Sequence, residues 1–336
     1  MKIIELREGW GPENLVAAER PDPSPGPGQV VLRLKAASIN FRDYLMVQGG
    51  YGSTAGTLPL IPLSDGVGEV VEIGKGVTRV AVGDRVCPTF FQGWVSGPPE
   101  EGALATALGG PLDGVLCELM VLSEDGVVKV PDGLDDDAAA TLPCAGLTAW
   151  NAVVGQGGVG KGDLVLIQGT GGVSIFALQF ARMLGCEIVI TSKSDEKLER
   201  ARGLGADHTI NYTATPDWGK AARKLAGRRV DLVVDVGGAK TLAESLRALG
   251  VGGRIAMMGV LSGAMAQLPI ASIVMRAVRL QGITVGSRAD FEAMVAAIAE
   301  HDIRPVVDRT FGFGELRAAL DHLEGQSHFG KICLSY

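Results

Sequence analysis

The run Gln168-Gly169-Thr170-Gly171-Gly172-Val173-Ser174 has the residue types and spacing of a loop that binds a pyrophosphate. The first glycine allows a tight turn, and the second lets the backbone approach the phosphates closely. The helix expected next presents free N–H groups and its positive dipole end to that anion. Ser174 replaces the third glycine of the Gly-x-Gly-x-x-Gly pattern and is small enough for close helix–strand packing. We therefore predict a dinucleotide site at Gly169, Thr170, Gly171, Gly172 and Val173.

The choice of dinucleotide depends on the end of the next strand, which reads Thr191-Ser192-Lys193-Ser194. An NAD site has an Asp or Glu there to hold the ribose hydroxyls. Small hydroxyls and a cation suit a 2′-phosphate instead, because Lys193 supplies a charge partner. We predict NADP(H), with Ser192 and Lys193 as contacts. The alternative is that a serine only caps the next helix and Lys193 is a solvated surface charge.

Strands alternate with helices from about residue 126, which indicates a doubly wound parallel sheet and an α/β fold. Asp163–Gln168 is a continuous apolar run typical of a buried strand, and Val173–Leu184 has helical apolar spacing. Residues 1–125 are instead rich in Gly and Pro with short alternating apolar runs, which indicates a compact β-rich domain. Gln92–Pro111 is expected to be a long loop.

Composition excludes several classes of protein. The net charge is −7 without a run of five or six basic residues, so nucleic acid and anionic membranes are poor partners. The apolar stretches are strand-sized and Met1–Arg7 lacks a signal pattern, so no membrane or targeting segment is expected. Five widely spaced cysteines indicate free thiols in a reducing compartment, and we predict a cytoplasmic protein.

Several motifs together resemble the medium-chain dehydrogenase/reductase superfamily, and the resemblance runs essentially end to end. Besides the glycine turn they are Ala37-Ser38-Ile39-Asn40-Phe41-Arg42-Asp43, Pro62-Leu63-Ser64-Asp65-Gly66-Val67-Gly68-Glu69-Val70, Gly83-Asp84-Arg85-Val86, Leu142-Pro143-Cys144-Ala145-Gly146-Leu147-Thr148-Ala149 and Gly203-Leu204-Gly205-Ala206-Asp207. The resemblance implies a GroES-like catalytic domain from residues 1–125 and 278–336. It also implies an inserted Rossmann domain, residues 126–277.

The sequence departs from the superfamily's zinc enzymes at the metal ligands. A catalytic zinc needs about three protein ligands from Cys, His, Asp or Glu. The first cysteine position is Asn40 here, and the usual His-Glu pair is Ser64-Asp65. Cys144 alone stands at a ligand position, and the cluster of four cysteines that forms the structural zinc lobe is missing. We therefore predict no metal, with Cys144 as a neutral thiol near the nicotinamide.

Without a metal, hydrogen bonds must polarise the substrate carbonyl or alkene. The resembling metal-free reductases use an Asn and tyrosines in the first motif, which match Asn40, Tyr44 and Tyr51 here. An amide or hydroxyl can donate to a developing enolate oxygen while hydride arrives from the nicotinamide. Alternatively, Asn40 fixes a turn or contacts ribose, and Tyr44 is half-buried core. Arg42-Asp43 is expected to be a structural ion pair.

The resemblance also implies further cofactor contacts at strand ends, where ligands of parallel sheets bind. They are Thr148, Tyr212, Gly237, Gly259, Val260, Gly286, Ser287 and Lys331, the last reaching the phosphates. Members commonly dimerise through the last Rossmann strand, here Leu280–Val285. An exposed edge of that apolar content would otherwise aggregate, so a homodimer is expected.

Three functions remain open. The first is zinc-independent, NADPH-dependent reduction of an activated double bond in a small quinone, enone or enoyl substrate. The second is a metal-free alcohol or aldehyde dehydrogenase. The third, of another class, is a low-turnover NADPH-binding structural or regulatory protein.

Overall fold

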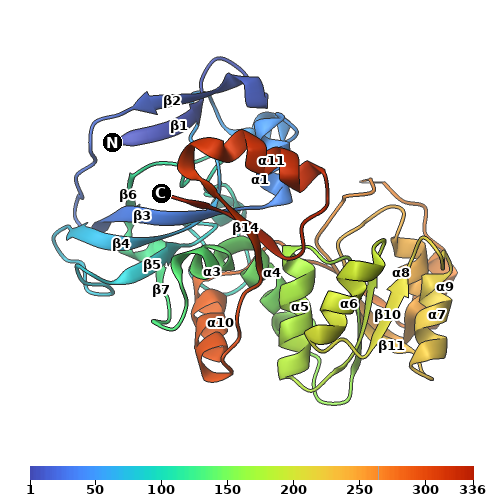
Figure 1. Ribbon diagram of the computed structural model, residues 1–336. Coiled ribbons are helices and arrows are strands. Elements are labelled where there is room, and N and C mark those ends of the chain that lie inside the picture. The colour runs from blue at the N-terminus through green and yellow to red at the C-terminus, as the bar shows by residue number, and fades with distance from the viewer. Residues whose placement is uncertain (264) are drawn as a thin grey trace. The chain divides into compact units, whose positions relative to one another are not determined.

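The computed structural model describes residues 1–263 and 265–336 and divides them into two compact units (Figure 1). The discontinuous unit comprises Met1–Leu147 and Gly286–Tyr336, and the inserted unit comprises Thr148–Val285. These boundaries lie later in the chain than the expected ones. Residues 126–147 belong with the first unit because the strand Val127–Lys129 pairs in its sheet. No helix among the described residues is long and apolar enough to cross a bilayer.

The discontinuous unit contains a seven-stranded sheet in the order β14-β15-β3-β4-β5-β7, with β6 also paired to β3, and a separate β1-β2 hairpin. Its strands are β1 (Lys2–Leu6), β2 (Leu15–Glu19), β3 (Gln29–Ile39), β4 (Asp65–Ile73), β5 (Arg85–Pro88), β6 (Leu119–Ser123), β7 (Val127–Lys129), β14 (Val307–Gly312) and β15 (Lys331–Ser335). Its helices are α1 (Phe41–Val47), α2 (Glu101–Leu104), α3 (Asp136–Ala140), α10 (Arg288–Glu300) and α11 (Leu316–Glu324).

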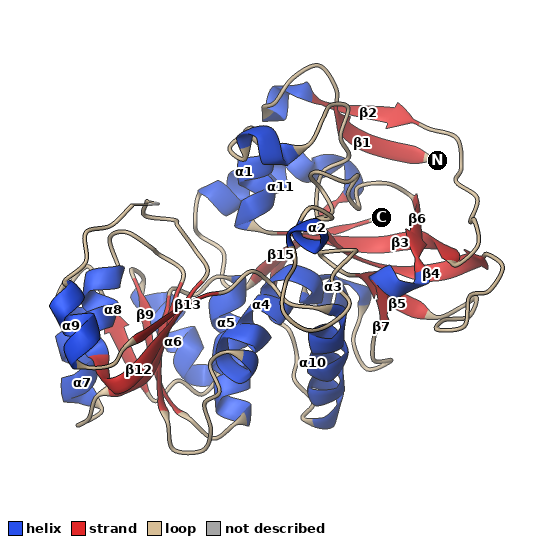
Figure 2. Cartoon of the chain, turned by 180° about the vertical axis from the view of Figure 1, so that it is seen from behind, coloured by secondary structure: helices blue, strands red, loops and turns tan. Residues whose placement is uncertain are grey.

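The strand β15 lies antiparallel beside β3, with Ile332 opposite Ile39 (Figure 2). On its other side β3 pairs with β4, where Ser38 faces Asp65. Apolar residues of β3, β4 and β15 are buried in one core, including Leu32, Val70 and Ile332. This core holds three strand ends in register, and the polar residues at those ends form the candidate active site.

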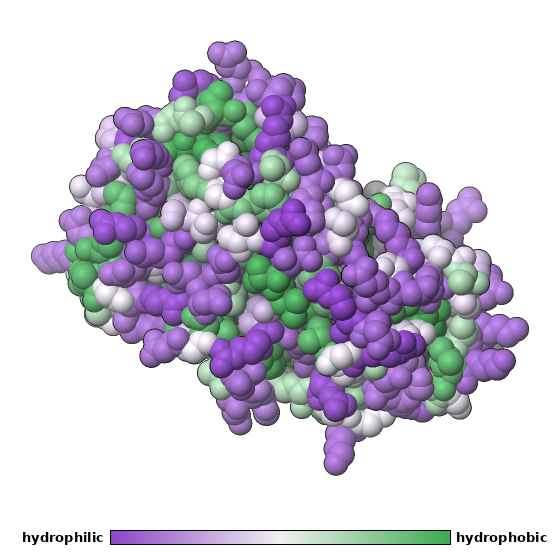
Figure 3. All heavy atoms as spheres, viewed as in Figure 1, coloured by the Kyte–Doolittle hydropathy of each residue, from purple (hydrophilic) through white to green (hydrophobic). Residues whose placement is uncertain are grey.

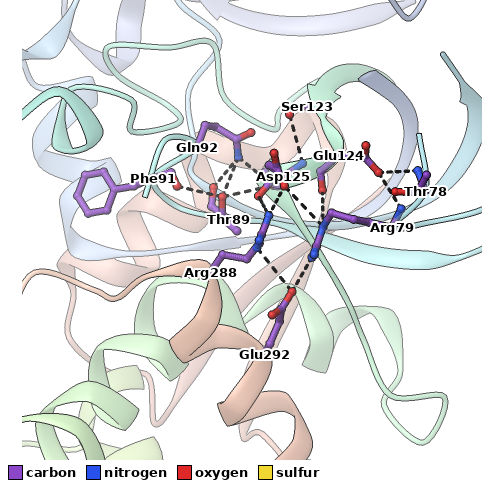
Figure 4. A network of polar contacts seen from close by, with 11 residues as sticks. Thr78, Arg79, Thr89, Phe91, Gln92, Ser123, Glu124, Asp125, Arg288 and Glu292 are labelled. Carbon is purple, nitrogen blue, oxygen red and sulfur yellow. Dashed lines mark hydrogen bonds and ion pairs between the residues drawn. The ribbon is translucent and has the colours of Figure 1, made fainter. Parts of the chain in front are cut away.

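An ion-pair network fastens α10 to the discontinuous unit (Figure 4). Arg288, at the start of the helix, contacts Asp125, and Arg79 Nη2 donates to Glu292 Oε1 at 2.5 Å. The backbone N–H of Arg288 also donates to Trp94 O at 2.9 Å. The start of α10 is therefore bonded to the beginning of the segment Gln92–Pro111, which the sequence predicts to be a long loop. The structure shows one short helix, α2, within that segment.

The inserted unit is the doubly wound parallel sheet expected from the sequence, in the order β10-β9-β8-β11-β12-β13. Its strands are β8 (Leu164–Gln168), β9 (Glu187–Ser192), β10 (His208–Asn211), β11 (Val230–Asp235), β12 (Leu249–Met257) and β13 (Arg279–Gly282). Its helices are α5 (Gly172–Met183), α6 (Asp195–Gly203), α7 (Trp218–Leu225), α8 (Leu242–Ala248) and α9 (Ile270–Met275); the short α4 (Leu147–Trp150) crosses the unit boundary.

Both faces of this sheet are covered. Leu164 and Leu166 pack in one cluster with Trp218 of α7 and Leu246 of α8. Val165 and Ile167 alternate with them along β8 and are also fully buried. Successive side chains of a strand point to opposite faces, so helices must bury both, which explains why β8 is apolar throughout.

Polar side chains cover most of the face shown in Figure 3. Among the described residues, half of the exposed large apolar side chains lie in the inserted unit, around α9 and the edge strand β13. They are Val251, Val260, Leu261, Met265, Ile270, Val274, Met275 and Leu280. Every residue of β13 is exposed.

Candidate active site

Asn40 lies where β3 ends and α1 begins. Its backbone is extended, with φ −121° and ψ 159°, so it is the N-cap residue of the helix. The backbone N–H of Asn40 donates to Asp43 Oδ2 at 2.8 Å. An acid in the first helical turn also complements the helix dipole. Asp43 therefore fixes the backbone at Asn40.

Lys331, the first residue of β15, reaches the same point from the other end of the chain. Its side chain is 3% exposed, and Nζ donates to Ile39 O at 2.7 Å and to Asn40 Oδ1 at 2.5 Å. The sequence interpretation had this ammonium reach cofactor phosphates. In the structure the ammonium is hydrogen-bonded to Asn40, because the antiparallel register of β15 on β3 places Lys331 and Asn40 side by side.

Asp65, at the start of β4, adds a buried carboxyl group. Its Oδ1 accepts from Ser64 Oγ at 2.7 Å and its Oδ2 from the backbone N–H of Cys144 at 3.0 Å. Burial raises the pKa of Asp65 to about 6, although the Lys331 ammonium acts in the opposite direction. Burial likewise raises the pKa of Asp43, against the lowering effect of Arg42.

The thiol of Cys144 is half-buried beside this group. Burial raises the pKa of Cys144, and the negative charge of Asp65 raises it further. A thiol with a raised pKa stays protonated at neutral pH, which suits a neutral thiol and not a nucleophile.

These residues do not fit a catalytic zinc ion. The residues at the ligand positions offer one carboxylate (Asp65), one thiol that burial keeps protonated (Cys144) and weak neutral oxygens. The Asn40 oxygen is already bonded to an ammonium group. A divalent cation would be repelled by that ammonium. Among the side chains of residues 1–263 and 265–336 there is no group of three His, Cys, Asp or Glu residues that could hold a metal.

The two predicted tyrosines are in different surroundings. Tyr51 is exposed and lies against Arg42, whose guanidinium is 5.7 Å from the ring centroid. Burial of its hydroxyl raises the pKa of Tyr51, and Asp43 and Cys144 raise it further. The Tyr44 hydroxyl instead donates to Glu324 Oε1 of α11 at 2.6 Å, and its ring packs against the core. Tyr51, but not Tyr44, therefore lies near Asp43 and Cys144.

Arg42 is a structural residue here. Its guanidinium donates to the carbonyls of Leu108 and Gly110 at 2.9 and 3.1 Å and lies 3.4 Å from Asp43 Oδ1. It thereby holds the end of the 92–111 loop against α1.

The inserted unit contains the glycine turn that the sequence predicts to bind a pyrophosphate. Gly169 has φ +73°, a conformation that side chains other than glycine's rarely adopt, and Gly171 is the N-cap of α5. Ser174 Oγ donates to Gln168 O at 2.7 Å, so the serine closes the turn where the motif has glycine. Gly172 and Val173 begin the helix, and Thr170 is buried before it. The free N–H groups of a 12-residue helix fit a pyrophosphate.

Ser192, Lys193 and Tyr212 come together at the end of β9. The backbone N–H of Tyr212 donates to Ser192 O at 3.1 Å, and Lys193 is exposed directly after Ser192. Ser194 caps α6 by accepting from Lys197 N at 3.3 Å. The capping role considered as an alternative is therefore real for Ser194.

The turns after β11 and β12 lie against each other. A Cβ atom on Gly259 would fall 2.0 Å from Val236 O, so only glycine allows this approach. Gly237 N donates to Asp235 Oδ1 at 3.0 Å, and Val260 is exposed. The sequence interpretation missed Asp235, although an acid that ends a buried strand just before two glycines is a recognisable signal.

The remaining predicted cofactor residues occupy helix starts. Thr148, in α4, is buried. Ser287 caps α10: its Oγ accepts from Asp290 N at 3.2 Å and donates to Asp290 Oδ2 at 2.7 Å. A Cβ atom on Gly286 would lie 3.0 Å from the Leu147 side chain. The Ser287 hydroxyl is thus already used by the helix.

Two family models match this chain. The alcohol dehydrogenase GroES-like domain matches residues 26–132, and the zinc-binding dehydrogenase domain matches residues 172–300. A zinc-type alcohol dehydrogenase-like protein of Schizosaccharomyces pombe is 43% identical over 315 residues, which cover 92% of this chain and 91% of the relative. The chain belongs to the medium-chain dehydrogenase/reductase superfamily.

Other relatives in the superfamily carry names for different reactions. A quinone oxidoreductase of Pseudomonas aeruginosa is 31% identical and covers 99% of both chains. An acryloyl-coenzyme A reductase of Sulfurisphaera tokodaii is 30% identical and covers 94% of both. The superfamily therefore includes relatives of this chain named for alcohols, quinones and an acryloyl thioester.

Solved structures of the superfamily confirm the fold and both of its parts. An NAD-dependent alcohol dehydrogenase superposes with a TM-score of 0.91 at 35% identity, and a mycobacterial protein complexed with NADPH superposes at 0.83 and 28% identity; each covers the whole of both chains. Medium-chain dehydrogenases/reductases bind a nicotinamide cofactor, and the glycine turn of the inserted unit fits its pyrophosphate. The neighbours include both NAD and NADPH proteins.

Proposed function

We propose that the chain is a zinc-independent, NADPH-dependent reductase of an activated double bond, such as that of a quinone, an enone or an enoyl thioester. The observation that carries the proposal is the buried amide of Asn40. Among the described residues, no acceptor meets its Nδ2 in hydrogen-bond geometry, while Lys331 donates to its Oδ1. An unused donor in a group that does not fit a metal is suited to bind a developing oxyanion.

Addition of hydride to an alkene conjugated with a carbonyl moves an electron pair onto the carbonyl oxygen. When bound, the reduced nicotinamide supplies that hydride. Asn40 Nδ2–H donates to the oxygen as its negative charge develops, which lowers the barrier. The α-carbon then takes a proton from solvent or from the Tyr51 hydroxyl, which the raised pKa keeps protonated at neutral pH.

The test is to incubate purified protein with NADPH and a panel of quinones, enones and enoyl thioesters, before and after treatment with a chelator. We expect NADPH consumption with at least one acceptor, unchanged by the chelator, in protein that elemental analysis shows to lack stoichiometric zinc. Activity that the chelator abolishes and zinc restores would overturn zinc independence. Tight NADPH binding without turnover would favour the structural or regulatory alternative.

A metal-free alcohol dehydrogenase is the second candidate, favoured by the alcohol dehydrogenase names among the similar proteins. Alcohol-dependent reduction of NADP⁺ that is insensitive to chelators would distinguish it. Such activity should exceed NADPH-dependent reduction of the double bond of any enone if this candidate is correct.

Dimerisation through β13 is part of the proposal. The strand is an exposed edge of a parallel sheet, and Val274, Met275 and Leu280 are exposed beside it. Pairing with the same edge of a second copy satisfies its backbone and covers these side chains. Light scattering should give a dimer mass for the wild type and a lower mass for Leu280→Lys.

A further inference from the structure

The side-chain amide of Asn40 can in principle face Lys331 with either its oxygen or its nitrogen. A lysine ammonium has three donors and no acceptor. Only Oδ1 can therefore face Nζ, and the 2.5 Å contact between these atoms has one chemically sensible orientation. The amide nitrogen is consequently turned away from Lys331.

Lys331 is held firmly enough to impose this orientation. Its side chain is 3% exposed, and the second bond, to Ile39 O at 2.7 Å, anchors Nζ at the end of β3. Asp43 and Asp65 are both buried, and the ammonium lowers the pKa of each. A buried cation is tolerated only with such partners, because desolvation otherwise outweighs its attractions.

The other end of the amide is left unused. Asn40 is 9% exposed, and Nδ2 forms no hydrogen bond in the described chain. The Asn40 side chain lowers the pKa of both Asp65 and Asp43 by hydrogen bonding, so these carboxyls lie near the amide, yet neither meets Nδ2 in full hydrogen-bond geometry. Buried donors in native proteins almost always have partners, so an orphan indicates an acceptor that arrives with a ligand.

We propose that Lys331 is a positioning residue that locks the Asn40 amide with Oδ1 inward, so that Nδ2 remains available to a substrate oxygen. The inference rests on the proposed function and deepens it. Lys331 acts through Asn40, because its side chain is 3% exposed and two of the three Nζ donors are committed to Ile39 O and Asn40 Oδ1. Neutral residues at position 331 would let the amide rotate and satisfy itself on Asp65.

The test is a double-mutant cycle in the full-length protein with Lys331→Met, Asn40→Ala and both together. Lys331→Met should lower kcat by about 100-fold, as expected for loss of a preorganised donor. The KM for NADPH should change less than about threefold in the same variant, because the binding turn is untouched. Lys331→Met in the Asn40→Ala background should cost at most about twofold more, since its action requires the amide.

The matched control is Lys35→Met on β3, whose ion pair with Glu69 is long and solvent-exposed. It should leave kcat unchanged. Lys331→Arg keeps the charge and the donors and should retain most of the stability and kcat, which guards against a Met variant that does not fold. Circular dichroism and NADPH titration establish folding for each.

Several results would overturn the positioning role. They are unchanged kcat in folded Lys331→Met, additive losses in the cycle, and a folded Lys331→Arg as inactive as Asn40→Ala. Wild-type protein that reduces no acceptor contradicts the proposed function instead, so the two failures are distinguishable.

Discussion

Asp65 begins a strand and Asp235 ends one, and both carboxylates are fully buried, yet their surroundings differ. Asp235, in the inserted unit, accepts from Gly237 N, Gly238 N and Thr241 Oγ1 on one oxygen and from Ser245 Oγ on the other. Asp65, in the discontinuous unit, accepts two hydrogen bonds, and burial raises its pKa to about 6.

The difference indicates a structural role for Asp235 and a perturbed, incompletely bonded carboxyl group at Asp65. A carboxylate with four donors organises a backbone turn and is committed to it. A buried carboxylate with fewer donors is incompletely hydrogen-bonded, so its pKa is raised. Groups with perturbed pKa values concentrate at functional sites. Asp235 thus has the surroundings of a structural carboxylate, whereas Asp65 has those of a perturbed carboxyl group beside the candidate active site.

The largest effect is expected from Asp235→Ala. It strands two backbone N–H groups and two hydroxyls, and should lower the free energy of unfolding by about 3 kcal/mol. Urea unfolding followed by fluorescence measures this. Asp235→Asn keeps one acceptor oxygen and should cost clearly less. Equal losses in both variants would show that the four bonds do not explain the stability of the turn.

The second effect concerns pH and Asp65. Its pKa is raised on folding, so its favourable contribution is complete below about pH 4, the pKa of an unperturbed Asp, and is lost as pH rises through about 6. Relative to Asp65→Asn, the wild type should therefore lose about 2 kcal/mol of stability between pH 4 and pH 7. Parallel pH–stability curves for the two proteins would contradict the raised pKa.

The third effect concerns the contribution of the inserted unit to cofactor binding as opposed to catalysis. Lys193→Ala should raise KM for NADPH about tenfold, because the 2′-phosphate loses a charge partner worth about 1.4 kcal/mol. KM for NADH and kcat should barely change. A matching loss with NADH would mean that Lys193 does not read the 2′-phosphate.

The smallest effect is expected from Tyr44→Phe. The hydroxyl bonds Glu324 near the surface, where such contacts contribute about 1 kcal/mol or less. Activity should stay within about twofold of the wild type, whereas Tyr51→Phe should slow protonation. A large loss of kcat in Tyr44→Phe would instead indicate a catalytic role for the Tyr44 hydroxyl.

The glycine turn between strand and helix, where we expect the nucleotide to bind, was predictable because its signals are local. Strand, glycine turn and helix follow one another within about 20 residues, and each has its own residue preference. The strand at Asp163–Gln168 and the helix after Gly171 were found for the same reason.

The group around Asn40 was only partly predictable. Asn40 and Tyr44 are four residues apart and would share a face of a regular helix. Asn40 is instead an extended N-cap residue, so its side chain does not follow the helical spacing. The partnership with Lys331 depends on the register of β15 on β3, which no local pattern specifies.

The contact between Asn40 and Lys331 spans 291 residues of chain, and the whole inserted unit lies within that loop. The inserted unit is one continuous segment and can fold from its own contacts. The discontinuous unit has the Asn40–Lys331 contact only after Gly286–Tyr336 has joined Met1–Leu147, a closure that is entropically costly and slow. We expect a chain arrested before that step to bind the nucleotide but not to reduce a substrate. The order of folding would then establish binding before turnover.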